Sequence, residues 1–263
     1  MFSDTKPSST KMFGSVKKDP LSNPNPKPKP KPKEQSQSNQ SQTQKNQNSL
    51  NSFFSSQKKE QKIQEPEKDI VDCILIMGDV HIPNRIDSIP EEVKKILEDN
   101  KSKFTRIICT GNFGNIETYN YFKNLLGKEY QLNFNCVKND FQETLLNFPE
   151  TITIKSNEYK IGVINGYQIV PWGDLSTLRS YSKKLECDIL ISGFTHIKGV
   201  YNFEGKYFIN PGTITGAFSS LSNNPTPSFM ILITVNDNAS LFLYELNANT
   251  KAFDVSKIEL NKS

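Results

Sequence analysis

Both histidines of this chain stand where metal chemistry could take place. His81 follows Asp79 in the segment Gly-Asp-Val-His, directly after the apolar run 73–77. His196 closes the segment Gly-Phe-Thr-His, directly after the run 188–192. Buried strands that end in tight glycine turns deliver polar side chains to the carboxyl edge of a sheet, where α/β proteins bind ligands. A carboxylate and imidazoles are donors that divalent ions accept, so these residues are candidate metal ligands.

Two further strand-like runs end in candidate ligands. Asn112 follows Gly111 after the run 106–109, and Asp140 follows the run 134–137. Both side chains offer the oxygen atoms that divalent ions accept. Each candidate also has a simpler interpretation, in which His81 is a histidine hydrogen-bonded in a polar pocket and Asp140 serves its loop.

Together these fragments resemble the dinuclear metallophosphoesterase family, whose pattern is Asp-x-His, Gly-Asp or Gly-Asn, Gly-Asn or Gly-Asp, His, and Gly-His-x-His. The resemblance implies a first-ion site formed by Asp79, His81, Asn112 and His196. It also exposes three departures, at positions where relatives usually carry histidine: Asn165, Tyr167 and Phe194. A phenyl ring has no lone pair, and an amide is a weak substitute for imidazole. We therefore expect no required cofactor and at most one weakly bound divalent ion, Zn, Mn or Mg.

Within that family, residues from about Cys73 to Ser263 resemble the branch of small phosphoesterase-fold subunits of retromer, an endosomal coat. Five motifs carry the likeness in order: Gly-Asp-Val-His-Ile-Pro at 78–83, Cys-Thr-Gly-Asn at 109–112, Pro-Trp-Gly-Asp at 171–174, Ile-Leu-Ile-Ser-Gly at 189–193 and Ile-Asn-Pro-Gly at 209–212. The resemblance implies a scaffold, not an enzyme, in endosome-to-Golgi retrograde transport. Its expected location is the cytoplasm and the cytosolic face of the endosome membrane.

The resemblance also implies the main partner. The former active-site face, rimmed by Ile169, Val170, Pro171 and Trp172, is expected to bind the carboxyl-terminal end of retromer's large α-solenoid subunit. Through that subunit it would meet the arrestin-like subunit and sorting nexins. Trp172 has two interpretations, a core plug or an interface anchor, and the apolar character of its loop favours the anchor.

The competing function is a residual one-metal phosphodiesterase or phosphatase. With the histidines missing at 165, 167 and 194, little remains to orient water or to protonate a leaving group. We therefore favour the scaffold.

A second apolar patch, away from the metal pocket, is where relatives bind regulators of Rab GTPases. Matching residue by residue places seven residues there: Cys73, Ile96, Leu97, Leu221, Phe242, Tyr244 and Val255. Phe242 and Tyr244 share one face of a strand, so they are equally consistent with the core. Leu221 discriminates between these interpretations because its loop neighbours are polar.

Composition divides the chain into two regions. Residues 1–70 hold eight of the fifteen prolines, and thirteen lysines against seven acidic residues give them a net charge of +6. Because the whole chain carries +4, the remainder carries −2. Such Pro/Lys/Gln/Asn/Ser-rich sequence predicts a disordered tail over 1–70 and one domain over 71–263. The tail is either an arm for nucleic acid or anionic lipid or a solvated extension. Because its lysines alternate with prolines, we favour the extension and expect no nucleic-acid partner.

No stretch approaches the ~20 apolar residues of a membrane span, and no signal-peptide core follows Met1. We expect no direct membrane insertion. The four cysteines fall in or beside strand-like runs without a C-x-x-C spacing, which indicates buried reduced thiols.

The elements that must position these residues alternate along the chain. We expect strands over 73–77, 106–109, 131–137, 151–154, 159–164, 189–192, 200–203, 207–209, 229–235, 241–246 and 253–258. Helices should begin at caps Ser88, Asn115 and Asp174 and end near Leu97, Leu126 and Lys184. Such βα units followed by hairpins predict a four-layer α/β/β/α sandwich of two mixed sheets, as the resemblance also implies.

Overall fold

The computed structural model describes residues 70–139 and 147–262, which form two mixed β-sheets. The first sheet has the order β11 (Phe253–Leu260), β10 (Asn238–Leu246), β9 (Ser228–Val235), β1 (Val71–Met77), β2 (Arg106–Cys109), β3 (Phe134–Cys136). The second has the order β4 (Thr151–Ser156), β5 (Tyr159–Ile164), β6 (Ile189–Ile191), β8 (Lys206–Asn210), β7 (Gly199–Phe203). Among the described strands, parallel pairing is confined to β1–β2–β3 and β5–β6–β8.

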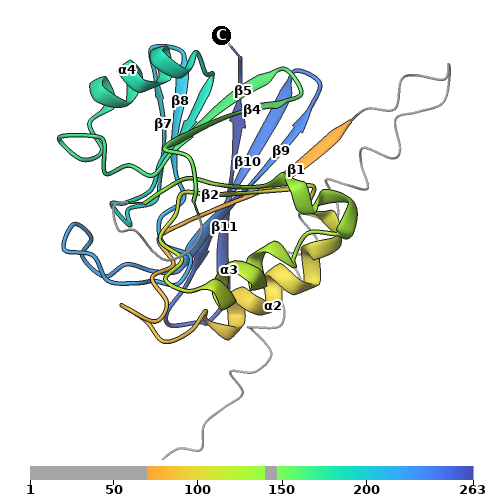
Figure 1. Cartoon of the computed structure of the whole chain (residues 1–263), viewed down its shortest axis with the longest axis vertical. Helices are drawn as coiled ribbons and strands as arrows, with labels where there is room; N and C mark the ends of the chain where they lie inside the picture. The colour runs from red at the N-terminus through yellow and green to blue at the C-terminus, as the bar shows by residue number, and fades with distance from the viewer. Residues whose placement is uncertain (1–69, 140–146, 263) are drawn as a thin grey trace, which may run out of the picture. The chain divides into compact units, whose positions relative to one another are not determined.

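Helices cover the outer face of each sheet, so the predicted four layers are confirmed. The helices α2 (Glu91–Asn100) and α3 (Ile116–Lys123) lie against the first sheet, whereas α4 (Leu175–Leu185) lies beside β7 and β8 of the second (Figure 1). None of these three helices has the length and apolar character of a membrane-spanning segment.

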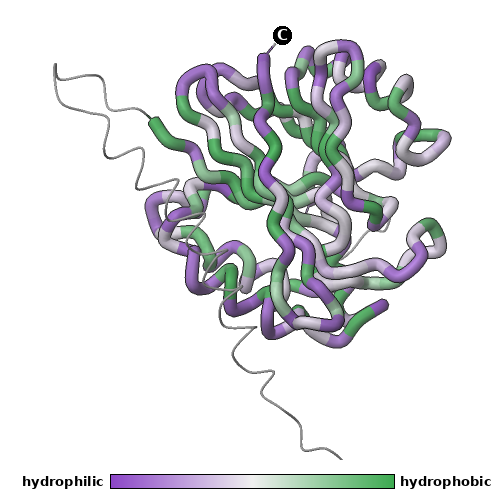
Figure 2. Tube along the Cα trace, turned by 180° about the vertical axis from the view of Figure 1, so that it is seen from behind, coloured by the Kyte–Doolittle hydropathy of each residue, from purple (hydrophilic) through white to green (hydrophobic). Residues whose placement is uncertain are grey.

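Strand β1 explains the layering, because successive side chains on a strand point to opposite faces. Leu75 packs in the cluster that includes Val93 and Leu97 of α2. Ile74 and Ile76 pack in the cluster between the sheets. A strand buried on both faces reads as a continuous apolar run. Figure 2 shows the hydrophobic segments concentrated along the strands and the hydrophilic ones along the outer turns.

Some helix and strand boundaries differ from expectation. Helix α2 begins at Glu91 instead of just after Ser88, because the Pro90 carbonyl accepts the first helical bond from Lys94 N–H. Helix α3 ends at Lys123 rather than Leu126, because Leu125 N–H turns to the Phe122 carbonyl in a tighter turn. The strand expected over 131–137 is shortened to β3, because the 3₁₀ helix Lys128–Asn133 precedes it.

The caps predicted for helices α3 and α4 are confirmed. Asn115 accepts a hydrogen bond from Thr118 N–H at 2.8 Å, and Asp174 accepts one from Thr177 N–H at 2.7 Å. Each side chain satisfies one of the backbone donors that a helix leaves unpaired at its first turn.

Candidate metal centre and pocket

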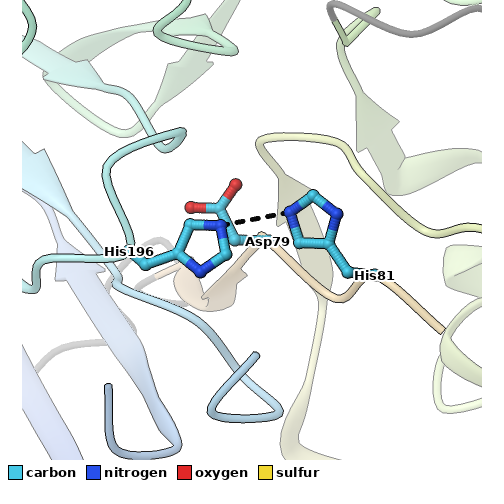
Figure 3. Close-up of side chains that lie close together, drawn as sticks. All are labelled: Asp79, His81 and His196. Atoms are coloured by element: carbon cyan, nitrogen blue, oxygen red, sulfur yellow. Dashed lines mark hydrogen bonds between the residues drawn. The ribbon is translucent and has the colours of Figure 1, made fainter. Parts of the chain in front are cut away.

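Three of the predicted ligands meet where strands of both sheets end. Asp79 and His81 follow β1 of the first sheet, and His196 follows β6 of the second. Their ligand atoms all lie within 4.8 Å of one another, and all three residues are buried (Figure 3). Asp140 lies outside the described residues. The three residues meet because each follows a buried strand at the carboxyl edge of its sheet, as the sequence predicts.

Glycine is required in the turns that carry these residues. A Cβ at Gly78 would lie 1.8 Å from the Thr110 hydroxyl oxygen, and one at Gly193 would lie 2.3 Å from the same atom. Only a residue without a side chain permits this approach. The glycines before Asp79 and Phe194 thus let the two sheets bring their loops together.

The backbone of the site is left-handed at five non-glycine residues. These are Asp79 (φ 49°), His81 (54°), Asn112 (64°), Phe194 (75°) and His196 (58°). Residues held in such conformations cost about 1–3 kcal/mol each and concentrate at functional sites. The strain is retained at Phe194, although its side chain offers no ligand atom.

Hydrogen bonding fixes the direction of the His196 ring. Its Nδ1 donates to the Ala217 carbonyl at 2.7 Å, because that carbonyl can only accept. Its Nε2 then faces Nε2 of His81 at 3.1 Å, the bond drawn in Figure 3. A backbone acceptor that orients the second ring nitrogen is the usual arrangement for a metal-binding histidine.

Both imidazoles are neutral at physiological pH. Burial, the positive charge of Arg85 and the neighbouring His196 together lower the pKa of His81 to about 3. Burial also lowers the pKa of His196 to about 4, against an opposing effect of the hydrogen bond to Ala217. Neutral imidazole is the form that binds metal ions. One carboxylate and two neutral imidazoles therefore fit a single divalent ion such as zinc.

The residues at the second-ion position do not fit a metal. Asn165 is fully buried, and its Nδ2 donates to the Thr110 carbonyl at 2.6 Å and to Asn112 Oδ1 at 2.9 Å. The Phe194 ring lies 5.3 Å from the ring of Trp172. Tyr167 donates its hydroxyl hydrogen to Glu150 at 2.6 Å. The phenyl ring and the amide nitrogen offer a cation no lone pair, and the amide oxygen of Asn165 is a weak substitute for the imidazole that relatives carry.

His81 and His196, two of the three ligands, line a pocket of about 400 Å³. Asn112 and Phe194 line it together with Trp172 and with Arg85, which the sequence analysis missed. Phe218, also missed, is 66% exposed, and its carbonyl accepts a hydrogen bond from Arg85 Nη1 at 3.0 Å. An aromatic residue in a polar loop was the available signal for Phe218. Arg85 gave no comparable signal.

The rim predicted to bind a partner has a buried base and an exposed edge. Ile169 is buried at 1% exposure and anchors its segment. Val170 and Trp172 are 71% and 52% exposed, and Pro171 between them is also exposed. The core-plug interpretation of Trp172 is therefore wrong for this chain by itself, because half of the indole faces solvent.

The second apolar patch does not form one exposed surface in this chain. Leu97, Phe242 and Tyr244 are buried, and Tyr244 stacks on Phe229 with ring centroids 4.9 Å apart. Cys73 is likewise buried, whereas Ile96 and Val255 are half-buried against the same cluster. The face shared by Phe242 and Tyr244 is the one that packs into the core, so the core interpretation applies to them.

Leu221 stands apart from this set. It is 36% exposed and lines the pocket that also contains His81 and His196. The expectation that it lies away from the metal pocket is therefore corrected. Its loop returns to the site because two backbone carbonyls just before it accept hydrogen bonds there. Arg85 donates to the Phe218 carbonyl, and His196 donates to the Ala217 carbonyl.

The fold and this site define a calcineurin-like phosphoesterase domain, and residues 73–237 match the family model described as the calcineurin-like phosphoesterase superfamily domain. The chain is 29% identical over 177 residues to vacuolar protein sorting-associated protein 29 from Schizosaccharomyces pombe, a match that covers 66% of this chain and 90% of that one. Vacuolar protein sorting 29 from Cryptosporidium parvum has a solved structure that is 33% identical, with a TM-score of 0.68, over 74% of this chain and 100% of that chain.

A third relative was solved with a metal. The wild-type vacuolar protein sorting 29 from Entamoeba histolytica, complexed with zinc, is 35% identical, with a TM-score of 0.65, over 72% of this chain and 99% of that chain. The chain therefore belongs to the vacuolar protein sorting-associated protein 29 family of calcineurin-like phosphoesterases. This family provides the phosphoesterase-fold subunit of retromer, so the chain has a retromer subunit role.

Proposed function

We propose that this chain is a non-catalytic scaffold of the retromer coat in endosome-to-Golgi retrograde transport. Its pocket rim, Ile169–Trp172, binds the carboxyl-terminal end of the large α-solenoid subunit, which connects it to the arrestin-like subunit and sorting nexins. The observation that carries this proposal is the exposed edge formed by Val170 and Trp172. Exposed apolar side chains beside a pocket are typical of protein interfaces, and tryptophan is enriched among their anchors.

The location follows from the assembly. A subunit that joins the coat through a protein partner acts in the cytoplasm and on the cytosolic face of the endosome membrane. The folded domain over 71–263 carries this function, and the tail over 1–70 is dispensable for it. This division rests on the composition of the two regions.

The proposal that the chain is not an enzyme rests on its ligand set. Hydrolysis by two metals needs ions on both the attacking and the leaving oxygen, and Phe194 and Asn165 do not fit the second ion. Asp79, His81 and His196 fit one ion. The zinc complex of the Entamoeba histolytica relative supports zinc as that ion. Bound by these three residues, the ion would have a structural role, because Asp79 and His81 follow β1 of the first sheet and His196 follows β6 of the second.

The partner proposal is tested with Val170→Asp. This substitution places a charge on a rim residue that is 71% exposed, so it should abolish co-purification with the α-solenoid subunit while the melting temperature stays unchanged. Leu132→Asp is the matched control, because Leu132 is 96% exposed but lies outside the pocket. Retained binding by Val170→Asp, or equal loss in both variants, would show that the rim is not the interface.

The absence of catalysis is tested by measuring hydrolysis of a phosphodiester. Purified protein loaded with zinc or manganese is incubated with a generic phosphodiester, and the product is compared with that from the His81→Ala and His196→Ala variants. We expect equal background rates in all three. Turnover by the native chain that both substitutions remove would establish the phosphoesterase alternative.

We propose that Rab-GTPase regulators bind a second surface around the half-buried Ile96 and Val255. Val255→Asp should abolish capture of the regulators and leave α-solenoid binding intact. Leu221→Asp should abolish α-solenoid binding and leave capture of the regulators intact, because Leu221 lines the pocket. If Leu221→Asp instead removed only the regulators, the two surfaces would have to be continuous, and this assignment of Leu221 would be wrong.

A further inference from the structure

Asn165 joins the two sheets at their carboxyl edges. It follows β5 of the second sheet, whereas both of its hydrogen-bond acceptors, the Thr110 carbonyl and Asn112 Oδ1, follow β2 of the first. Asn165 is 0% exposed, so these bonds are shielded from water. Hydrogen bonds are electrostatically stronger in such surroundings. A single amide therefore makes the connection between loops that a shared ion would otherwise make.

The orientation of this amide is fixed by its neighbours. Turning it over would place Oδ1 against the Thr110 carbonyl, which can only accept. The observed orientation leaves Asn165 Oδ1 without a hydrogen-bond partner among the described residues. It also directs both amide hydrogens at the loop after β2. Both amide hydrogens are thereby used in hydrogen bonds, and the nitrogen that carries them offers a cation no lone pair.

Asn112 gains a defined position from this contact. Its side chain lines the same pocket as His81 and His196, and its backbone carbonyl accepts a hydrogen bond from His81 N–H at 2.6 Å. The Asn165 amide thus acts on the ligand cluster through Asn112. Partners that orient ligands in this way typically change metal affinity by about 10–100-fold when they are removed.

We propose that Asn165 is a positioning residue that substitutes for the second ion. Its amide ties the loop after β5 to the loop after β2 and holds Asn112 in the pocket, so that the site is complete with one divalent ion. This inference concerns the interior of the pocket and is independent of which protein binds the rim.

The test uses the full chain with zinc alone as the probe, measured by isothermal titration, and with Co²⁺, whose visible absorption reports ligand geometry. The native chain should bind one equivalent. Asn165→Leu keeps the approximate volume but removes both hydrogen bonds. It should bind one equivalent about 10–100-fold more weakly, with an altered cobalt spectrum. Its melting temperature should fall by roughly 3–10 °C.

Asn100→Leu provides the matched control. Asn100 is also a buried asparagine, and its amide donates to the Ile96 carbonyl at 2.8 Å in helix α2, outside the pocket. This variant should lose stability while its zinc affinity and cobalt spectrum stay native. A purely structural role for Asn165 would give the same pattern in Asn165→Leu and would overturn the proposal.

Two equivalents of zinc bound by the native chain would also overturn it, because the amide would not then replace an ion. If Asn165→Leu does not fold, Asn165→Ala is measured in the same way, since it leaves room for water in place of the amide. The same weakening of zinc binding is expected, and native affinity in that variant would refute the proposal.

Discussion

Trp172 is the residue on which the proposed interface most depends, and its truncation gives a quantitative test. Trp172 is 52% exposed in this chain by itself. A tryptophan side chain presents up to about 250 Å², so roughly 130 Å² is left for a partner to cover. At about 25 cal/mol per Å², covering that area stabilises the complex by roughly 3 kcal/mol. Trp172→Ala should therefore raise the Kd for the α-solenoid subunit about 100-fold.

The same substitution also affects the free protein. The Trp172 ring lies 5.3 Å from the Phe194 ring, and such pairs contribute about 0.5–1.5 kcal/mol beyond their buried area. For a domain of this size, 1 kcal/mol corresponds to about 2–4 °C in melting temperature. We expect a decrease of roughly 1–6 °C, so the variant remains folded at the temperature of the binding assay.

The assay is isothermal titration with a carboxyl-terminal fragment of the α-solenoid subunit. Tyr201→Ala is the matched control, because Tyr201 is 49% exposed but lies on β7 and does not line the pocket. Its Kd should equal that of the native chain. A change of less than about threefold for Trp172→Ala would show that the indole is not covered in the complex, and the reasoning from its exposure would be refuted.

Three further outcomes are expected. Deleting residues 1–68 should change neither the melting temperature nor α-solenoid binding, and lost binding would make the tail part of the interface. The four buried cysteines should resist a thiol reagent at pH 8 until the protein is unfolded, because burial raises the pKa of Cys73 to about 12 and raises that of Cys187. A fast-reacting thiol in the native protein would contradict this. Hydrogen bonds from Ser176 and Thr177 lower the pKa of the Asp174 carboxyl in the folded protein below its ordinary value of 3.8. The ionised cap therefore stabilises the fold at any pH above 3.8. This stabilisation is lost as the pH falls from 3.8 through the pKa of the folded protein. Thermal melts of Asp174→Ala should therefore show a deficit at pH 7 that shrinks at pH 3, and a constant deficit would exclude the ionised cap as its cause.

The sheets could be predicted from the sequence because their signal is local. Apolar runs such as Ile189–Ile191 predict buried strands from a few neighbouring residues, and a strand that ends in Gly-Asp or Gly-Phe delivers the next side chains to the sheet edge. That rule was enough to bring Asp79 and His196 together from distant segments.

The wall of the pocket could not be predicted in the same way. Phe218 and Leu221 reach it because carbonyls of their loop bind Arg85 and His196, a long-range contact with no periodic signature. The two-residue period correctly gave Phe242 and Tyr244 a common face but could not say that this face is covered. The same period also could not predict the orientation of the Asn165 amide, because that orientation depends on the Thr110 carbonyl, which follows a strand of the other sheet.

The position of β1 has a consequence for how this chain is made. β1 is synthesised before every other strand of the first sheet, yet it lies in the middle of that sheet. One of its neighbours is β2, but the other is β9, which is far from β1 in the sequence, with Ile74 paired to Leu232. Non-local pairing of this kind is slow and leaves apolar strand edges open while it is incomplete. During translation, β1 must therefore wait, with one edge unpaired, until Val235 at the end of β9 has left the ribosome.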